Sequence, residues 1–411
     1  MLPGGKHQPI RFNLRELSGG LGDAGLFIPI AVAMIALNGL NATAVFAVAG
    51  LVYMATALYF RVPVPVQPLK AFAAAAIALH LSAETLAAGA LLMAAAMALL
   101  AATGTAGWLA KRFPTALVRG IQASVALLLA KAAIELAQKG NWDGLPSIDP
   151  TLSLVLAAAC CLLLLAVARD RWLPGSLMVL AAGAAIGIGV DGLPSGIGAG
   201  PEAISWSPPG GADFAIALTT LVLAQIPLTF GNSVVATADA EREYFGERAR
   251  RVDPGRLASS ISLSNVAAGL TGGLPVCHGA GGVTAHYRLG ARTAGATLMV
   301  GALYLTLGLV LGASLPAFLH LLAPGALAGM LLFVAIQHAV LAGRLERVDD
   351  RVLAAGIGLI TLLTGNLAIG AGAGIVALLL RALLRRRIGV QTRPTSQWED
   401  SAAPETARSV R

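Results

Sequence analysis

Hydrophobic residues fill long uninterrupted stretches of this chain, and charged residues gather in the short segments between them. Stretches such as 86–102, 151–168 and 293–311 approach the length of about 20 apolar residues that crosses a bilayer. The pattern predicts fourteen membrane spans in two sets of seven. We expect these spans at residues 17–38, 43–60, 64–80, 85–103, 114–137, 151–168, 173–190, 213–239, 256–270, 274–289, 293–313, 317–342, 350–365 and 367–386.

Composition supports an all-α, polytopic membrane protein. Of 411 residues, 56% are hydrophobic and 12% are charged, whereas soluble domains carry about 25% charged residues. No cleavable signal peptide is expected at the N-terminus. The three cysteines, Cys160, Cys161 and Cys277, lie in apolar sequence without the spacing of a disulfide framework or a metal site, so we expect neither a metal nor a cofactor.

The positions of the basic residues predict the orientation of the chain. Lys and Arg precede the first span and recur in every second loop, whereas the loop 191–212 carries Asp191 and Glu202 and neither Lys nor Arg. Basic loops remain on the cytoplasmic side, so we expect a multi-pass protein of the inner membrane with both termini cytoplasmic. This explains the net charge of +8 by topology and excludes a nucleic-acid partner.

Two apolar segments are interrupted by similar breaks 210 positions apart. The first is Pro63–Lys70 and the second is Gly273–Gly282. At this offset Pro65 aligns with Pro275, and Gln67 with Cys277. Proline favours extended backbone at itself and at the preceding residue, so each break predicts a short strand that leads into a helix. The breaks fall in the third and tenth spans, at corresponding places in the two halves.

The repeat extends beyond the breaks. Pro114–Leu117 recurs as Pro324–Leu327 at the same offset, and Gly22-Asp23 resembles Gly231-Asn232. Because seven spans per copy is an odd number, the second copy is inverted relative to the first. Irregular backbone at membrane depth is tolerated only inside protein or against a cavity, so we expect the two breaks to lie together near the midplane.

The breaks carry candidate ligands for an anion. A helix N-terminus presents free N–H groups and about half a positive charge. Gly279, Gly281 and Gly282 leave the backbone of the second break bare, and Ala280 lies between them. Gln67, His278 and Cys277 belong to the same breaks, and Lys70 adds positive charge. Paired breaks of this kind indicate a transporter's binding site, and ordinary proline kinks are the alternative.

Further polar residues lie within the spans. Gln225, Thr229 and Asn232 share one face of the eighth span, where they either complete the site or form hydrogen bonds between helices. Asp23 in the first span, together with His278, is a candidate for proton coupling, and pairing with a neighbour is the alternative for its carboxylate. Isolated histidines are predicted to be structural: His80, His320 and His338.

The two breaks resemble the signatures of the plant and microbial molybdate transporters, relatives of the SulP sulfate permeases. Pro63–Ala71 looks like the first signature, and Leu274–Thr293 looks like the second. Gln225–Thr229 with Asn232–Val234 is similar to a third patch. Leu69 and Gly231 depart mildly from the expected pattern. The resemblance implies a seven-plus-seven fold like that of uracil permease, in which a core moves against a gate, without the regulatory STAS domain of SulP permeases.

The division that follows from the resemblance has six parts. We expect a cytoplasmic N-terminus at 1–16, the core domain at 17–105 and 212–315, the gate domain at 106–211 and 316–387, and a disordered cytoplasmic tail at 388–411. The predicted function is secondary import of molybdate by elevator-type alternating access, by a protein that is not an enzyme. Sulfate or tungstate transport, an anion channel and a nucleobase–proton symporter are the alternatives. A homodimer is expected by analogy of fold.

Overall fold

The computed structural model describes residues 9–105, 114–139, 148–167, 175–192, 198–204, 207–343 and 345–387. The predicted tail 388–411, residues 1–8 of the N-terminal segment and the loop residues Lys111, Arg112, Arg169, Arg171 and Arg344 lie outside the described residues.

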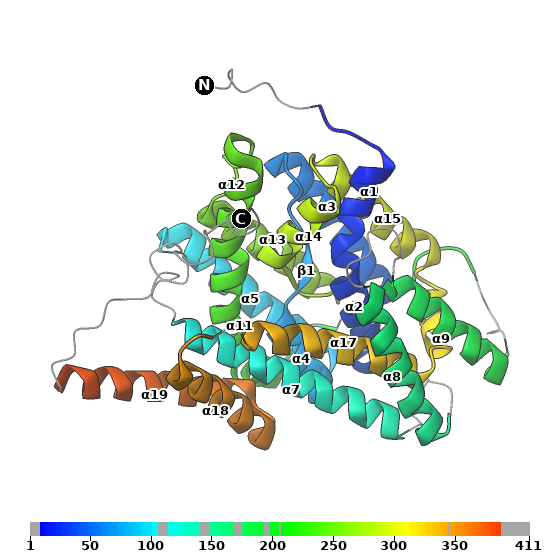
Figure 1. Cartoon of the computed structure of the whole chain (residues 1–411). Helices are drawn as coiled ribbons and strands as arrows, with labels where there is room; N and C mark the ends of the chain where they lie inside the picture. The colour runs from blue at the N-terminus through cyan, green and yellow to red at the C-terminus, as the bar shows by residue number, and fades with distance from the viewer. Residues whose placement is uncertain are drawn as a thin grey trace, which may run out of the picture.

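Two bundles of helices make up the described chain, as Figure 1 shows. The first bundle contains both strands. It consists of α1 (Leu14–Gly20), η1 (Leu21–Asp23), α2 (Ala24–Asn38), α3 (Ala42–Phe60), β1 (Gln67–Pro68), α4 (Lys70–Ala78), α5 (Ala83–Thr103), α10 (Gly211–Ala217), η2 (Leu218–Val222), α11 (Leu223–Leu228), η3 (Thr229–Val235), α12 (Ala236–Phe245), η4 (Gly246–Ala249), α13 (Pro254–Thr271), β2 (Val276–Cys277), α14 (Ala280–Leu289) and α15 (Gly295–Leu311).

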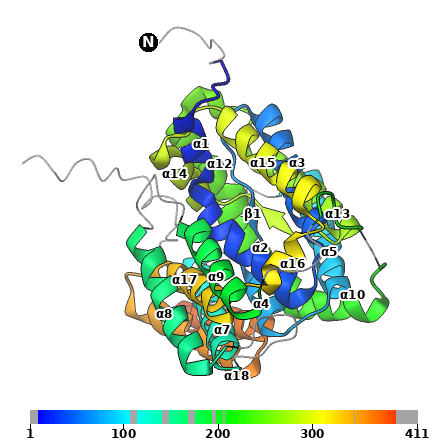
Figure 2. The same ribbon diagram turned by 90° about the vertical axis from the view of Figure 1, so that its right-hand side faces the viewer.

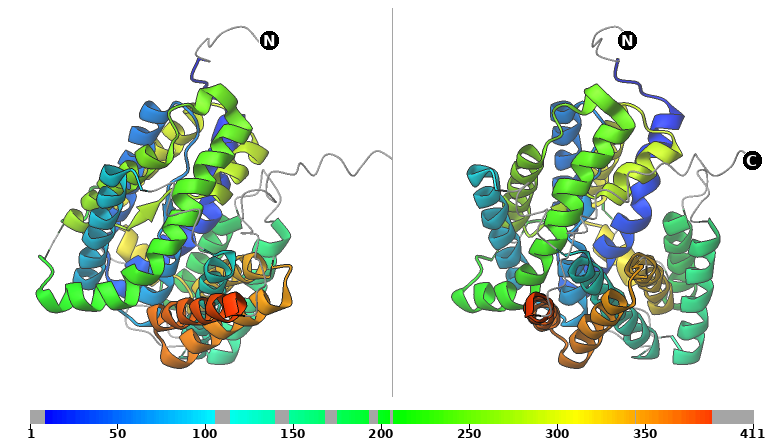
Figure 3. Two further views of the ribbon diagram at one scale, coloured as in Figure 1. Left: turned by 90° about the vertical axis from the view of Figure 1, so that its left-hand side faces the viewer. Right: turned by 60° about the vertical axis from the view of Figure 1, so that its left-hand side comes forward.

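The second bundle lies below the first in Figures 1 and 3. It consists of α7 (Thr115–Lys139), α8 (Pro150–Val167), α9 (Gly175–Asp191), α17 (Pro324–Ala342), α18 (Val348–Thr364) and α19 (Leu367–Arg387), and the short α16 (Leu315–His320) precedes α17. The bundles meet where α4 packs on α7 and where α2 packs on α17.

Eight described helices are long and apolar enough to cross a membrane. The prediction of an all-helical, polytopic membrane protein is therefore confirmed, whereas the count of fourteen spans stays a prediction. The third predicted span contains only nine helical residues, in α4, and the tenth contains ten, in α14. At 1.5 Å per residue each covers about 15 Å, half a bilayer, and each follows a two-residue strand.

Close backbone contact joins α3 to α15 in the first bundle. A Cβ atom on Gly50 would lie 2.6 Å from the carbonyl oxygen of Gly301, and one on Gly301 would lie 2.7 Å from the carbonyl oxygen of Gly50. Neither helix can accept a side chain at this crossing, which is how small residues hold membrane helices together. Figure 2 shows the two helices side by side at the edge of the bundle.

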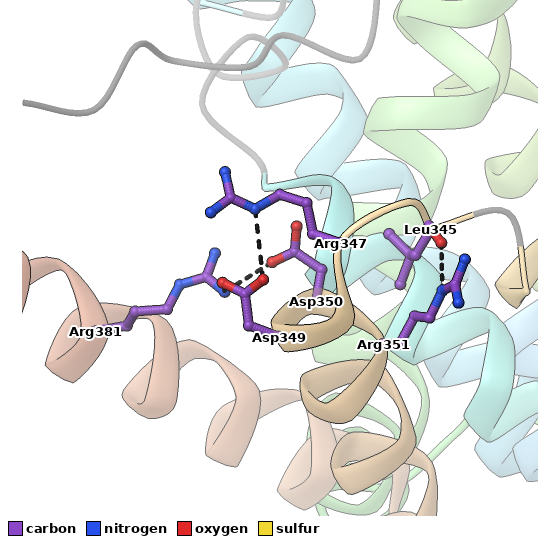
Figure 4. Close-up of polar contacts among 6 residues, drawn as sticks. All are labelled: Leu345, Arg347, Asp349, Asp350, Arg351 and Arg381. Carbon is purple, nitrogen blue, oxygen red and sulfur yellow. Dashed lines mark hydrogen bonds and ion pairs between the residues drawn. The ribbon is translucent and has the colours of Figure 1, made fainter.

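Ion pairs tie the ends of α18 and α19 together in the second bundle (Figure 4). One nitrogen of Arg381 lies 3.0 Å from a carboxylate oxygen of Asp349 and 2.7 Å from one of Asp350. Arg347 approaches Asp349 at 3.4 Å, and Arg351 donates to the carbonyl oxygen of Leu345. The two carboxylates also occupy the first turn of α18, where the helix dipole favours negative charge.

We expect Gly50→Ala to lower the stability of the protein, because the new methyl group overlaps the backbone of α15. Overpacking of this kind costs about 1–3 kcal/mol. Thermal unfolding of the purified protein in detergent measures the effect. Gly372→Ala in α19, where a Cβ meets open space, is the matched control and should melt no lower than the wild type. Equal melting of both variants would contradict the tight crossing.

Candidate functional site

An antiparallel pair of two-residue strands forms the centre of the first bundle. Gln67 pairs with Cys277, and Pro68 pairs with Val276. The N–H of Leu69 extends the ladder by donating to the carbonyl oxygen of Pro275 at 3.0 Å. Each strand leads directly into a helix, so α4 and α14 leave the ladder in opposite directions and their N-termini flank it. The two breaks predicted from the sequence therefore lie together.

Side chains from α13 support the outer edge of β2. The amide of Asn265 donates to the carbonyl oxygen of Val276 at 2.7 Å and accepts from the Val276 N–H at 3.2 Å, as a third strand would. The ring of His278 contacts the carbonyl oxygen of Pro65 at 2.8 Å and the hydroxyl of Ser260 at 2.9 Å. Because a carbonyl oxygen only accepts, Nδ1 of His278 is the donor to Pro65 and Nε2 is left to Ser260.

One side-chain amide connects two charged groups beside β1. Nε2 of Gln67 donates to Asp23 at 2.6 Å, and Oε1 of Gln67 accepts from the Lys70 ammonium at 2.6 Å. Asp23 ends the short helix η1 in the middle of the first predicted span, and its second oxygen is buried without a partner. Lys70 is the first residue of α4 and stays half-buried. Asp23 and Lys70 lie on different predicted spans, and the fold brings both into hydrogen bonds with the side-chain amide of Gln67.

The start of α14 is open where Gln67 does not cover it. A Cβ on Gly279 would overlap Oε1 of Gln67, and one on Gly282 would lie 2.6 Å from its Nε2, so these two glycines make room for the amide. Gly281, by contrast, is exposed, with open space where its Cβ would stand. The first N–H groups of a helix have no partner in their own helix, so Ala280 and Gly281 present donors to this space.

The eighth predicted span loses α-helical geometry near the site. Residues Thr229–Val235 form a π-helical segment, η3, and such segments often mark functional sites. Gln225 and Thr229, both buried, bond to each other, and Gln225 also accepts from the Phe72 N–H in the first turn of α4 at 2.9 Å. Asn232 remains half-buried within η3. Thr237, one turn later, donates to the carbonyl oxygen of His278.

The predicted site residues of the two breaks therefore lie at the strand pair, and Gln225 reaches the first turn of α4, but their surroundings differ. Lys70, Asn232, Ala280 and Gly281 retain exposure, whereas Gln225, Thr229, Cys277 and His278 are buried. Sequence reasoning missed Asn265 and Ser260. No sequence pattern shows that an amide on α13 pairs with Val276. The available signal was that the span 256–270 has a polar face.

A sequence profile of the family described as "Molybdate transporter of MFS superfamily" matches residues 15–129 and 217–337, which include both breaks and the eighth span. This chain belongs to that family. Other members of the family match this chain over most of their length. Molybdate transporter 2 of Arabidopsis thaliana is 30% identical over 90% of this chain and 87% of its own. Molybdate transporter 1 of Chlamydomonas reinhardtii is 26% identical over 78% and 82%.

Solved structures of anion transporters share the fold of this family member. The transmembrane domain of the cyanobacterial bicarbonate transporter BicA superposes with a TM-score of 0.64 at 18% identity, covering 89% of this chain and 98% of that one. Murine solute carrier 26 family member A9, an anion transporter in the inward-facing state, also gives 0.64, at 15% identity over 92% and 69%. At these identities the likeness shows the fold. The relatives are transporters, which agrees with the prediction that the protein is not an enzyme.

The end of the second family signature serves to hold helices together. The buried carboxylate of Glu16 in α1 accepts from the backbone N–H groups of Arg292 and Thr293. The Arg292 guanidinium stacks over the ring of Tyr287 at 3.8 Å, and Arg248 donates to the Arg292 carbonyl oxygen. This cluster fixes α1 and η4 against the end of α14, so the helix that starts at the site is held at both of its ends.

We expect Asn265→Leu to destabilise the strand pair, because it leaves the N–H and the carbonyl of Val276 buried without partners. Each such group costs about 1–3 kcal/mol. Thermal unfolding in detergent checks this. Thr271→Val on the same helix, which removes a hydroxyl bonded only to its own helix, should change stability by less than about 0.5 kcal/mol. An Asn265→Leu protein that melts like the wild type would refute the supporting role.

Proposed function

We propose that this protein is a secondary transporter that imports molybdate, and that the oxyanion binds at the N-termini of α4 and α14. The observation that carries the proposal is the open start of α14 at Gly281, whose neighbouring glycines lie against the Gln67 amide that accepts from the Lys70 ammonium. Membership of the molybdate transporter family and the anion-transporter fold support it.

The charges of the site suit a tetrahedral dianion. Lys70 and the two helix N-termini contribute positive potential, and the N–H groups of Ala280 and Gly281 offer donors at short range. In this proposal the Lys70 ammonium exchanges its hydrogen bond to Oε1 of Gln67 for one to the anion. The Gln67 amide then rotates to contact the anion. Asn232 completes the open side. Cys277 borders the anion from β2 through its backbone.

The buried predicted residues are assigned supporting roles within the same site. Gln225, bonded to Thr229, holds the first turn of α4 in place through the Phe72 N–H. His278 holds β2 against Pro65 and Ser260, and its backbone is the part nearest the anion. We assign proton coupling to Asp23 in preference to His278, because one Asp23 oxygen is buried without a partner while both ring nitrogens of His278 are engaged.

Transport would follow from displacement of the first bundle against the second. The first bundle corresponds to the core domain (17–105 and 212–315) and the second to the gate domain (106–211 and 316–387). Within each repeat we propose seven spans, fourteen in all, with both termini in the cytoplasm of a cell whose inner membrane holds the protein. Since the anion rests on core residues, moving the core past the gate would carry it across. A homodimer, expected by analogy of fold, is part of the proposal.

Sulfate is the closest alternative cargo, because it has the same charge and shape as molybdate. Tungstate should bind about as well as molybdate if size and charge decide. An anion channel would give uncoupled conductance without saturation. A nucleobase–proton symporter would need a carboxylate near the breaks, and Asp23 beside Gln67 is the one observation that favours it.

Purified protein should bind molybdate and tungstate in isothermal calorimetry, and proteoliposomes should accumulate molybdenum with saturation. We expect the affinity order to be molybdate and tungstate first, sulfate next and uracil last. Planar bilayers should carry no molybdate current of channel size. Binding of sulfate or uracil without binding of molybdate would contradict molybdate as the substrate. A large current that does not saturate would contradict a transporter mechanism and indicate a channel.

We expect Gly281→Ala to weaken molybdate binding at least about tenfold, which is 1.4 kcal/mol, the scale of one hydrogen bond to a charged group. The methyl group would occupy the space in which the anion approaches the N–H groups. Because this space is open, the variant should fold normally. Lys70→Met should weaken binding as strongly, whereas Lys131→Met, at an exposed ion pair, serves as the charge control. Unchanged affinity for molybdate in both site variants would show that the anion does not bind at the start of α14.

A further inference from the structure

An arginine ends α3 in a backbone conformation that usually belongs to glycine. Arg61 follows the last residue of α3 with φ at 64°, and it is one of two non-glycine residues with positive φ in the described part of the chain. Left-handed backbone is less favourable for a residue with a Cβ, and glycine is the common choice at the end of a helix. Residues in such conformations often serve a function, so the Arg61 side chain is a candidate for one.

A hydrogen bond brings a second arginine to the same helix end. The Arg251 guanidinium donates to the carbonyl oxygen of Tyr59, two residues before Arg61, at 3.0 Å. Phe60 precedes Arg61 and Val252 follows Arg251, and both of these apolar residues are buried in one hydrophobic cluster. The cluster therefore fixes the backbone beside each arginine, while the two arginines themselves are exposed.

The helices α3 and α13 run antiparallel along the outer side of the first bundle. At one end Arg251, just before α13, reaches Tyr59 near the end of α3. At the other end a Cβ on Gly273, just after α13, would lie 3.2 Å from the carbonyl oxygen of Ala44 in the first turn of α3. Figure 2 shows this pair on the side of the first bundle that faces away from α7, α8 and α18. Their outward faces are therefore turned towards the bilayer.

Exposed leucines follow both helices up to the arginines. Leu51 and Leu58 are exposed on α3, and Leu263 and Leu270 are exposed on α13. Each pair is separated by seven residues, which keeps its two members on one face of the helix. Arg256 lies seven residues before Leu263, so the same face of α13 begins with a basic residue. In a membrane such a face lies against acyl chains, and its basic end lies at the level of the lipid headgroups.

The charge at this end of the two helices is positive. The segment 246–256 contains four arginines against two acidic residues, and Arg61 adds to the excess. Asp253 pairs with Arg256 at 3.2 Å and offsets its charge. Arg251 contacts Tyr59 through one nitrogen, and no hydrogen bond or ion pair within the described residues holds the Arg61 guanidinium. Arg61 and Arg251 therefore keep N–H donors for an anionic group.

We propose that Arg61 and Arg251 bind the phosphate of an anionic phospholipid whose acyl chains lie on the outer faces of α3 and α13. Arginine binds phosphate oxygens through paired hydrogen bonds, and basic residues at the ends of membrane helices attract anionic headgroups. Tyr59 is exposed beside Leu58, at the boundary between the apolar face and the arginines, where tyrosine is enriched in membrane proteins. The inference goes beyond the proposed function and does not depend on which anion the protein transports.

Thermal unfolding of the purified protein in detergent with added lipid tests this inference. We expect dioleoyl phosphatidylglycerol to raise the melting temperature of the wild type until the site is saturated, and dioleoyl phosphatidylcholine to raise it little. The phosphatidylglycerol concentration that gives half of the rise should increase about fivefold in Arg61→Gln and in Arg251→Gln, because each variant removes one basic residue from the headgroup. Arg288→Gln removes the same charge from an exposed position on α14 and should change this concentration less than about twofold.

The variant Arg61→Gly separates a lipid ligand from a residue that only ends the helix. Glycine adopts left-handed backbone without the penalty of a Cβ, so in phosphatidylcholine this variant should melt at or above the wild-type temperature. It should nevertheless need at least about fivefold more phosphatidylglycerol than the wild type for half of the rise.

Three results would contradict the lipid site. Equal half-rise concentrations in the wild type, Arg61→Gln and Arg251→Gln would show that the lipid does not bind at the end of α3. An equal loss in Arg288→Gln would show a diffuse attraction to positive charge. The same rise with inorganic phosphate, which has no acyl chains, would indicate a site for a soluble anion. A wild-type protein that binds no molybdate, tungstate or sulfate would overturn the proposed function and leave the lipid site standing.

Discussion

The pairing of two short strands inside an apolar bundle is the constraint on which the rest of this structure depends. Proline-rich segments cannot continue a helix, so each break leaves backbone groups without helical partners. Water is absent at membrane depth, and an unpaired group there costs several kcal/mol. The β1–β2 ladder satisfies part of this need, and Asn265 and His278 satisfy more. Only with the strands held in this way can two helices begin in the middle of the bundle.

The register of the ladder also explains why the two breaks face each other symmetrically. Gln67 and Cys277 are partners in the ladder, and they are also the positions that the predicted repeat makes equivalent, 210 residues apart. In an antiparallel pair, a residue and its repeat equivalent can oppose each other only if a local two-fold axis passes between them. The two helix N-termini related by this axis flank the same pair of residues, although the side chains they carry are different.

Much of this arrangement was predictable because it depends on backbone chemistry. Proline and glycine restrict or free the backbone wherever they occur, so the breaks at Pro65 and Pro275 and the bare turn at Gly281 were visible in the sequence. Side-chain partners were harder to predict, because they depend on how the helices are rotated against each other. The bond from Gln225 to the start of α4 and the bonds from the amide of Asn265 to β2 each join residues more than ten positions apart.

The difference between the two helix starts decides where an anion can be held. At α4 the Phe72 N–H is taken by Gln225, and the first residue carries the Lys70 ammonium on a flexible stem. At α14 the glycines bring backbone donors to an open space, and Gln67 covers the remainder. One end therefore supplies mobile charge and the other supplies fixed donors. The Gln67 amide is bonded to both Lys70 and Asp23, so an anion bound as proposed at Gly281 would compete for Lys70 and would alter the partner of Asp23 in the same step. This chain of contacts would link occupancy of the proposed site to a buried carboxylate without any movement of the helices.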